Sequence, residues 1–220
     1  MTYLNWPVGR LATQLPGATA VLFQHRINFC CLGHRLLDEV IQQHGLDEAA
    51  ILASLEELSN NKEAQTDWEN KDNAQLIEHL LTRYHEVHRQ QLTELVRLAK
   101  RVETVHQQHP LCPRGLADFL QEMKLDLEQH MQKEEMVLFP MLSADYAPMA
   151  GGPIHVMKME HEQHMKDIET LYKLTNDVSL HEDACNTWRA LYLGLQEFIS
   201  DINIHIHLEN DVLFARASKH

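Results

Sequence analysis

Two segments of the chain repeat one pattern in which a histidine and a glutamate interrupt an apolar helical face. HMQKEEMVLF begins at His130 and HIHLENDVLF begins at His205, and both read H-x-x-x-E-x-x-V-L-F. Upstream of each, apolar residues step by three and four, which is typical of an amphipathic helix that faces a partner. A polar pair on such a buried face is destabilising unless something satisfies it. The pattern therefore predicts helices that meet around a metal.

A second pair of segments repeats in step with the first. HEVH at His85 and HEQH at His161 both read H-E-x-H, and the distance to the next H-x-x-x-E motif is 45 residues in one copy and 44 in the other. A single H-x-x-x-E occurs on many solvated helices. Two copies on apolar stripes, each with the same upstream motif, indicate a duplicated helical hairpin that contributes the same ligands twice.

Breaks in the pattern divide the carboxyl-terminal part of the chain into four long helices. Pro110 is one break, and glycines and prolines cluster in SADYAPMAGGP at residues 143–153. Proline is tolerated at the start of a helix but not inside it. Each remaining segment is long enough to span a bundle at about 1.5 Å per residue. We expect helices over residues 72–109, 113–142, 153–176 and 181–217.

The amino-terminal part has a different composition. Residues 1–58 contain short apolar segments, and Gly45 and Asp47 are suited to end one helix and to cap the next. The polar stretch that follows, SNNKEAQTDWENKD, has no apolar period. We therefore predict an all-α chain: a small helical N-terminal domain at residues 1–58, a linker at residues 59–71 and a four-helix bundle at residues 72–220.

Charge and hydropathy exclude two classes of partner. The formal net charge is −13, which argues against nucleic acid because phosphate binding needs a basic surface. No apolar run approaches the length of a membrane span, so we expect no membrane partner. The first residues, MTYLNWPVGR, lack the basic and apolar stretches of a secretory signal, which predicts a cytoplasmic protein.

The candidate metal ligands are one histidine from each of the four helices and one glutamate from each of two. Two octahedral irons offer about twelve positions, of which four histidines, two bridging carboxylates and a bridging oxide or hydroxide fill ten, so each metal keeps one open position for O₂ or NO. A closed tetrahedral zinc site would waste ligands, and H-E-x-H is one residue short of the zinc-peptidase motif. We expect two iron ions per chain, held by His85, His130, Glu134, His161, His205 and Glu209.

Several side chains lie next to the proposed ligands in the sequence but are not assigned as metal ligands. His88 and His164 follow two of the proposed ligands by three residues on the buried face, and we expect them to orient ligands and not to bind metal. His207 is two residues from His205 and is expected at the surface. Residues that flank the ligands and could relay protons or iron, or line the pocket, are Glu160, Glu162 and Tyr84. Ordinary packing is the alternative for all of them.

The four cysteines fall into two kinds. Cys30 and Cys31 are adjacent, so they could form a strained disulfide, bind iron or accept NO; the alternative is a pair without function. They are the candidate reactive thiols, and no other catalytic residue is assigned. Cys112 and Cys185 are expected to be inert.

Taken together, these motifs make the whole chain resemble the RIC (repair of iron centres) family of di-iron proteins. That family joins a short N-terminal domain with a Cys-Cys motif to a hemerythrin-like four-helix bundle, and its iron ligands fall on the same six residues. One departure is that Leu32 precedes Gly33, where the family usually has a Gly-Gly-like turn. The matching segments are NFCC at 28–31, RYHEVHRQQL at 83–92, EQHMQKEEMVLFP at 128–140, MEHEQH at 159–164 and HIHLENDVLF at 205–214.

The resemblance implies a function that spacing alone does not reach. Family members repair iron–sulfur clusters damaged by nitrosative or oxidative stress, by handling nitric oxide or delivering iron. The implied partners are damaged iron–sulfur proteins, and the implied assembly is a homodimer. Two alternatives remain open: a hemerythrin-type module that binds or senses O₂, and a nitric oxide reductase that forms N₂O.

Overall fold

The computed structural model describes residues 3–15, 18, 21–22, 25–27, 32–60, 68, 71–143 and 149–217. This part of the chain is almost entirely helical, and its one β-type contact is an isolated bridge between Pro7 and Leu36. The prediction of an all-α protein is confirmed. None of the helices in these ranges is both long and apolar enough to cross a membrane.

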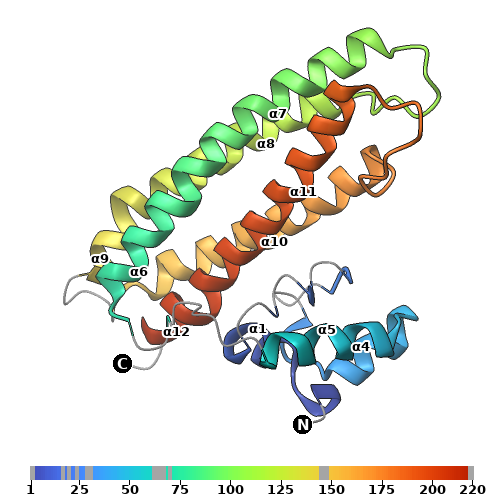
Figure 1. Cartoon of the computed structure of the whole chain (residues 1–220). Coiled ribbons are helices and arrows are strands. Elements are labelled where there is room, and N and C mark those ends of the chain that lie inside the picture. The colour runs from blue at the N-terminus through green and yellow to red at the C-terminus, as the bar shows by residue number, and fades with distance from the viewer. Residues whose placement is uncertain are drawn as a thin grey trace.

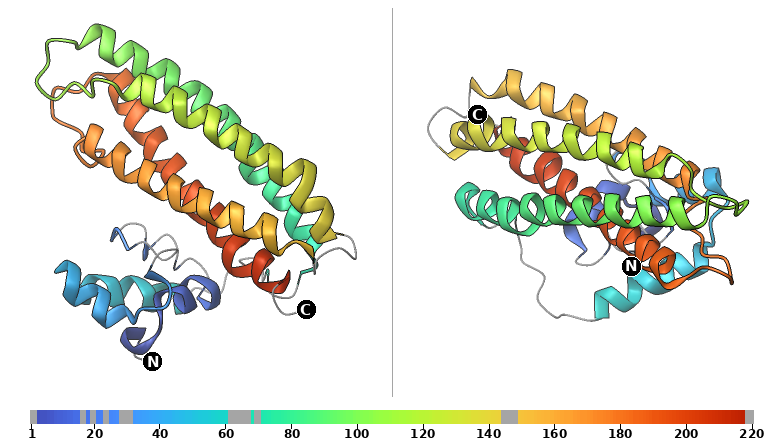
Figure 2. Two further views of the ribbon diagram at one scale, coloured as in Figure 1. Left: turned by 180° about the vertical axis from the view of Figure 1, so that it is seen from behind. Right: turned by 90° about the horizontal axis from the view of Figure 1, so that it is seen from above.

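Four long helical rods lie side by side and form the predicted bundle (Figures 1 and 2). Within it, α7 packs against α8 and α11, and α8 packs against α10. The rods consist of α6 (Asn73–His79), η3 (Leu80–His85) and α7 (Glu86–Val105); α8 (Leu116–Lys133), η4 (Glu134–Leu138) and α9 (Phe139–Ser143); α10 (Gly151–Leu174); and α11 (Asn186–His207), η6 (Leu208–Leu213) and α12 (Phe214–Ala217).

Three rods differ from the sequence-based expectation by three or more residues at one end. The first stops at Val105 and not at residue 109, because turns closed by backbone hydrogen bonds begin at His106. The second begins at Leu116 and not at residue 113, because a turn precedes it and Gly115 has a left-handed backbone at φ 86°. The fourth begins at Asn186 and not at residue 181, since the preceding residues form a turn in which Ala184 N donates to His181 O. Side-chain periodicity does not distinguish such turns from a helical end.

Three of the rods contain a π-helical turn, and each turn carries a residue of the repeated motifs. η3 ends with His85, η4 begins with Glu134, and η6 includes Glu209. A π turn adds a residue to the helical turn and so re-aims the side chains around it, and such turns are frequent at functional sites. A pattern of period 3.6 does not predict them, and α10 has none.

The bundle core has two apolar clusters with a polar layer between them. One cluster, towards the loops that join α7 to α8 and α10 to α11, includes Leu120, Trp188 and Phe198. The other, towards α9 and α12, includes Phe139 and Phe214. Between the two lie buried histidines and glutamates that belong to neither cluster. The fold therefore places a polar layer at a depth where water is excluded.

The N-terminal domain has an apolar core of its own. Its elements are η1 (Tyr3–Asn5), α1 (Val8–Gln14), α4 (Leu37–His44) and α5 (Glu48–Asn60), which pack around residues such as Leu11 and Ile51. Gly45 ends α4 in the left-handed conformation at φ 61°, and Asp47 accepts a hydrogen bond from the Ala50 amide at the start of α5. Both roles match the sequence prediction. Much of the predicted linker at 59–71 lies outside the described residues, so the domain boundaries stay a prediction.

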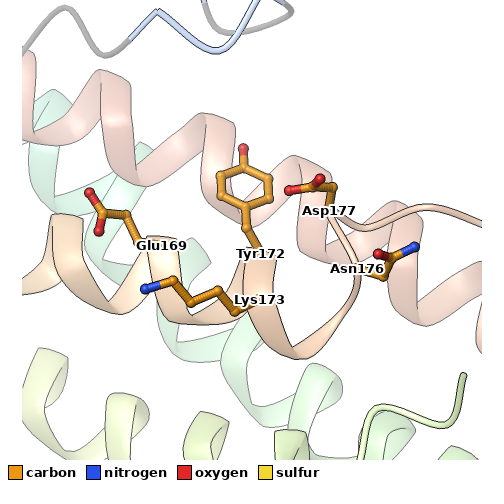
Figure 3. A pocket seen from close by; sticks show the side chains of 5 residues that line it. All are labelled: Glu169, Tyr172, Lys173, Asn176 and Asp177. Atoms are coloured by element: carbon orange, nitrogen blue, oxygen red, sulfur yellow. The ribbon is translucent and has the colours of Figure 1, made fainter.

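One ion pair joins the N-terminal domain to the bundle. Arg26 Nη1 lies 3.0 Å from Asp177 Oδ1, and its guanidinium group lies 5.5 Å from the centre of the Tyr172 ring. Both partners of the pair are more than half exposed, so its contribution to stability is small. An open pocket with mixed charge surrounds this point, lined by Glu169, Tyr172, Lys173, Asn176 and Asp177 (Figure 3). It is about three helical turns from the polar layer along α10.

The two faces of α8 give a direct test of this packing. Leu120 is fully buried, whereas Leu125 is 55% exposed on the same helix. We expect Leu120→Ala to lower the free energy of unfolding of the metal-free protein by about 2–5 kcal/mol, because it leaves a cavity. Leu125→Ala should change it by no more than about 0.5 kcal/mol. Urea unfolding measures both, and equal effects would contradict the packing.

Candidate metal centre

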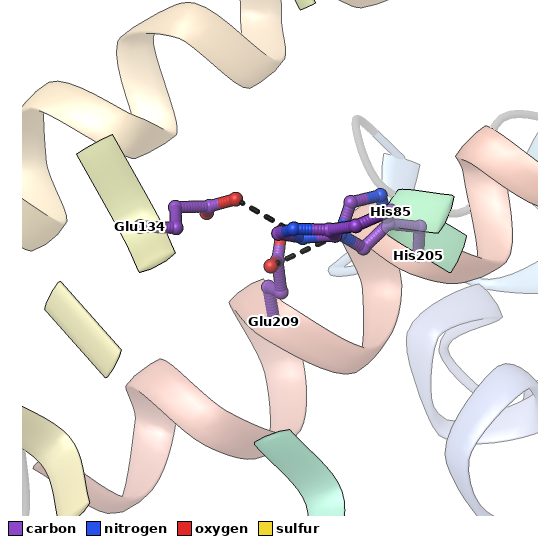
Figure 4. Close-up of side chains that lie close together, drawn as sticks. All are labelled: His85, Glu134, His205 and Glu209. Carbon is purple, nitrogen blue, oxygen red and sulfur yellow. Dashed lines mark hydrogen bonds and ion pairs between the residues drawn. The ribbon is translucent and has the colours of Figure 1, made fainter. Parts of the chain in front are cut away.

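The polar layer brings all six predicted ligands together. They form two groups of four residues, and within each group the candidate ligand atoms all lie within 4.8 Å of one another. The two glutamates belong to both groups, and Figure 4 shows the first group. The groups are His85, Glu134, His205 and Glu209, and His130, Glu134, His161 and Glu209.

The histidines meet in two couples. His85 Nε2 lies 3.2 Å from His205 Nε2, and His130 Nε2 lies 3.0 Å from His161 Nε2. Two neutral imidazoles that present lone pairs to one another repel, unless a proton or a cation lies between them. Each couple takes one histidine from each copy of the repeat. The two hairpins therefore interlock at the site, and neither copy forms a metal position alone.

The two carboxylates each face both couples. The two oxygens of Glu209 lie 3.1 Å from His205 Nε2 and 3.1 Å from His161 Nε2. Those of Glu134 lie 3.5 Å from His85 Nε2 and 3.4 Å from His130 Nε2. One oxygen is thus directed to each side, which is the arrangement that bridging two cations requires.

These carboxylates are buried without enough protein partners. Glu134 and Glu209 have no exposed surface. Both oxygens of Glu134 and Oε2 of Glu209 lack a hydrogen bond among the described residues. An unpaired charge in such a place is destabilising by several kcal/mol. Imidazole nitrogens and carboxylate oxygens converging on one point are a donor set that fits a divalent transition metal, so the residues present fit a pair of cations.

In the metal-free protein, the pKa values of the candidate ligands are shifted in opposite directions. Burial and the neighbouring His205 lower the pKa of His85 to about 2. Burial also acts to lower the pKa of His130, but Glu134 and further carboxylates outweigh it and raise that pKa to about 9. Burial and the charge of Glu209 raise the pKa of Glu134. The metal-free protein therefore carries protons that a metal must displace.

Three of the four histidines have a partner on the other ring nitrogen. Nδ1 lies 2.8 Å from Glu135 Oε1 in His85 and 2.9 Å from Glu160 Oε2 in His130. In His161 it lies 3.0 Å from Asn210 Oδ1. An acceptor at Nδ1 keeps the proton there and leaves Nε2 free for a metal, as is usual for metal-binding histidines.

The sequence pattern suggests Glu160 only as a relay and gives no role to Glu135 or Asn210. A clue was available, because Glu135 and Asn210 each directly follow the glutamate of a repeated motif. Glu162, the other candidate relay, is exposed on α10. Tyr84 is buried at the site, where its ring stacks on His205 at 5.4 Å with an angle of 6°.

His88 and His164 are buried next to the site but belong to neither ligand group. The His88 ring lies 5.3 Å from that of His205, and the His164 ring lies 4.9 Å from that of His130. His88 Nδ1 bonds to Gln91 Oε1 at 3.1 Å. Both residues thus contact ligand rings without joining the converging nitrogens.

The prediction for His207 is wrong. It was expected at the surface, but it is 3% exposed, and its Nδ1 lies 2.8 Å from Asp211 Oδ2. The prediction failed because α11 is covered over more of its surface than one amphipathic stripe requires; Asp201 and Asn203 are buried as well.

The cysteines take no part in the polar layer as far as the structure describes them. Cys30 and Cys31 lie outside the described residues, so their role stays a prediction. Cys112 is buried and Cys185 is partly buried, and both are free thiols. Cys185 Sγ lies 3.1 Å from His106 Nε2, where α7 ends and α11 begins.

Comparison with known proteins identifies the class of the bundle. Residues 76–217 match the family described as the hemerythrin HHE cation binding domain. Residues 4–59 match a domain of unknown function, DUF542. The fold and the two ligand groups therefore define the carboxyl-terminal part of the chain as a hemerythrin-type cation-binding bundle.

The full-length relatives are more specific. The iron–sulfur cluster repair protein YtfE of Yersinia pseudotuberculosis serotype IB (strain PB1/+) is 45% identical over 217 residues, which are 99% of this chain and 98% of that protein. The protein of the same name from Yersinia pestis (strain Pestoides F) is 44% identical over the same shares. The chain belongs to the YtfE family of iron–sulfur cluster repair proteins.

The raised pKa of His130 predicts a pH dependence of metal binding. At neutral pH a metal must displace the proton from this ring, so we expect the apparent affinity of the metal-free protein for ferrous iron to rise with pH. The rise should reach about tenfold per unit between about pH 6.5 and about pH 8.5. Calorimetry in buffers of different ionisation enthalpy counts the protons released. A pH-independent affinity over this range would contradict the assignment.

Proposed function

We propose that this protein repairs iron–sulfur clusters damaged by nitrosative or oxidative stress, and that it does so through a di-iron centre. The observation that carries the proposal is the pair of buried carboxylates, Glu134 and Glu209, each shared by two histidine couples. Identity of 44–45% to proteins named for cluster repair, over nearly the whole chain, supports the choice of reaction.

The ligands we assign to the two irons follow from the groups. Glu134 and Glu209 would be shared by both irons, His85 and His205 would hold one iron, and His130 and His161 would hold the other. Oxide or hydroxide is the expected third bridge. When bound, the irons supply open coordination positions for NO or O₂, one-electron redox chemistry, and iron that can be delivered to a damaged cluster.

The chain's own residues prepare the site for this task. Glu135, Glu160 and Asn210 fix the orientation of three ligand rings through Nδ1. Aromatic rings lie against the ligands. The ring centre of Phe139 lies 5.6 Å from that of His85, and the ring centre of Phe214 lies 6.1 Å from that of His161. An apolar surround of this kind favours small uncharged ligands over bulk water and ions.

O₂ binding or sensing is the second candidate, and the match to the hemerythrin HHE domain favours it. It assigns no role to residues 4–59, which the repair proteins share. Nitric oxide reduction is compatible with repair. Headspace analysis for N₂O after mixing the reduced protein with NO tests it. Repeated formation of N₂O per protein molecule, with an electron donor present, would establish a reductase.

The proposal extends to the setting and assembly of the protein. The stress response and the homodimer rest on the family resemblance, and damaged iron–sulfur proteins are the expected clients. A cytoplasmic location stays the expectation drawn from composition and sequence.

Restoration of a damaged enzyme tests the function. An iron–sulfur dehydratase inactivated by nitric oxide should regain activity when incubated with the iron-loaded protein under anaerobic conditions. His161→Ala should abolish this effect, because it removes one ring of a couple. His155→Ala on the same helix should leave it intact, since His155 is exposed. If neither wild type nor the control restores activity, or if His161→Ala restores it fully, the proposal fails.

A further inference from the structure

The two copies of the repeat differ in what surrounds their ligands. The repeat pairs His85 with His161 and His130 with His205. By the same alignment, Glu135 in the first copy corresponds to Asn210 in the second, because each follows the bridging glutamate. The residue before the first histidine is Tyr84 in one copy and Glu160 in the other. Both differences fall on side chains that contact ligand rings.

The couple of His85 and His205 is held on one side only. Glu135 lies 2.8 Å from His85 Nδ1. His205 Nδ1 is buried and has no hydrogen-bond partner among the described residues. Where a carboxylate would be expected from the other copy, Tyr84 stacks on the His205 ring instead. Stacking packs the ring but gives no acceptor for its N–H.

The couple of His130 and His161 is held on both sides. His130 Nδ1 lies 2.9 Å from Glu160, and His161 Nδ1 lies 3.0 Å from Asn210. Each ring of this couple therefore has an acceptor that fixes its tautomer and orientation. The difference between the couples reduces to His205, which is the one ligand ring without such a partner among the described residues.

The carboxylates that contact Nδ1 are themselves anchored in both couples. Arg89 Nη2 lies 2.9 Å from Glu135 Oε1, and its Nε lies 2.7 Å from Glu128 Oε2. Lys133 Nζ lies 2.5 Å from Glu160 Oε1. Each carboxylate thus has a cationic partner. The contacts of Arg89 and Lys133 are therefore similar in the two couples and do not compensate for the missing partner at His205.

The ligands themselves do not distinguish the two positions. Both carboxylates face the two couples at matched distances, 3.1 and 3.1 Å for Glu209 and 3.5 and 3.4 Å for Glu134. The four histidines are all at most 2% exposed. An inequality between the two metals must therefore come from the contacts behind the ligands.

We propose that the two metal positions are inequivalent, and that the metal at His85 and His205 is held more weakly and leaves first. This inference rests on the di-iron site proposed above and names which iron the protein would deliver. Loss of one such outer partner typically changes metal affinity by 10- to 100-fold. The His130 and His161 position would then keep its iron while the other is donated.

Release of iron to a chelator under anaerobic conditions tests the proposal. The diferrous protein should lose its iron in two phases of equal size, with rates that differ by about 10- to 100-fold. Mössbauer spectra of the half-depleted protein should retain one species. A single phase for both irons would overturn the inference.

Isosteric variants assign the phases to the positions. Glu135→Gln should speed the fast phase, because it weakens the hold on His85. Glu160→Gln should speed the slow phase, because it acts on His130. Glu169→Gln, an exposed change on the same helix as Glu160, should alter neither. If Glu160→Gln speeds the fast phase alone, the assignment of the weaker position is wrong.

The outcomes separate this inference from the proposed function. If the wild-type protein binds no pair of irons, the assignment of the six ligands is wrong. Protein that restores damaged clusters but releases both irons in one phase would leave the repair function standing and remove only the inequality of the two positions.

Discussion

Two buried carboxylates are the constraint on which the rest of the structure depends. Glu134 and Glu209 lie in the centre of the bundle with no exposed surface, and three of their four oxygens have no hydrogen bond among the described residues. Burial of such charges is tolerated only where cations or protons compensate them. The four histidines converge on the same two points, so the centre of this bundle is a donor set that fits cations and is not held by apolar packing alone.

The duplicated hairpin explains how one chain builds this arrangement. Each copy supplies two histidines and a glutamate, but each histidine couple draws on both copies. Correct ligand geometry thus requires the hairpins to dock against one another, which links metal binding to the tertiary fold. The copies have also diverged, at Tyr84 against Glu160 and at Glu135 against Asn210, so a symmetric set of ligands lies in an asymmetric surround.

The sequence was sufficient to predict the bundle and the six residues that meet in it, because a polar pair on an apolar stripe, present twice, has few structural solutions. It did not predict which histidines form a couple, because that depends on how the rods pack. The π turns at His85, Glu134 and Glu209 have no period of their own to detect. His207 was misplaced because burial on α11 depends on what other parts of the chain cover it.

The metal content of protein isolated without air, together with its Mössbauer spectrum, tests directly whether the bundle holds a di-iron centre. We expect two irons per chain, in sites of nitrogen and oxygen ligands that are bridged to one another. His130→Ala should lower the iron content, and exposed His155→Ala should not. One metal per chain, or zinc in place of iron, would contradict the di-iron centre.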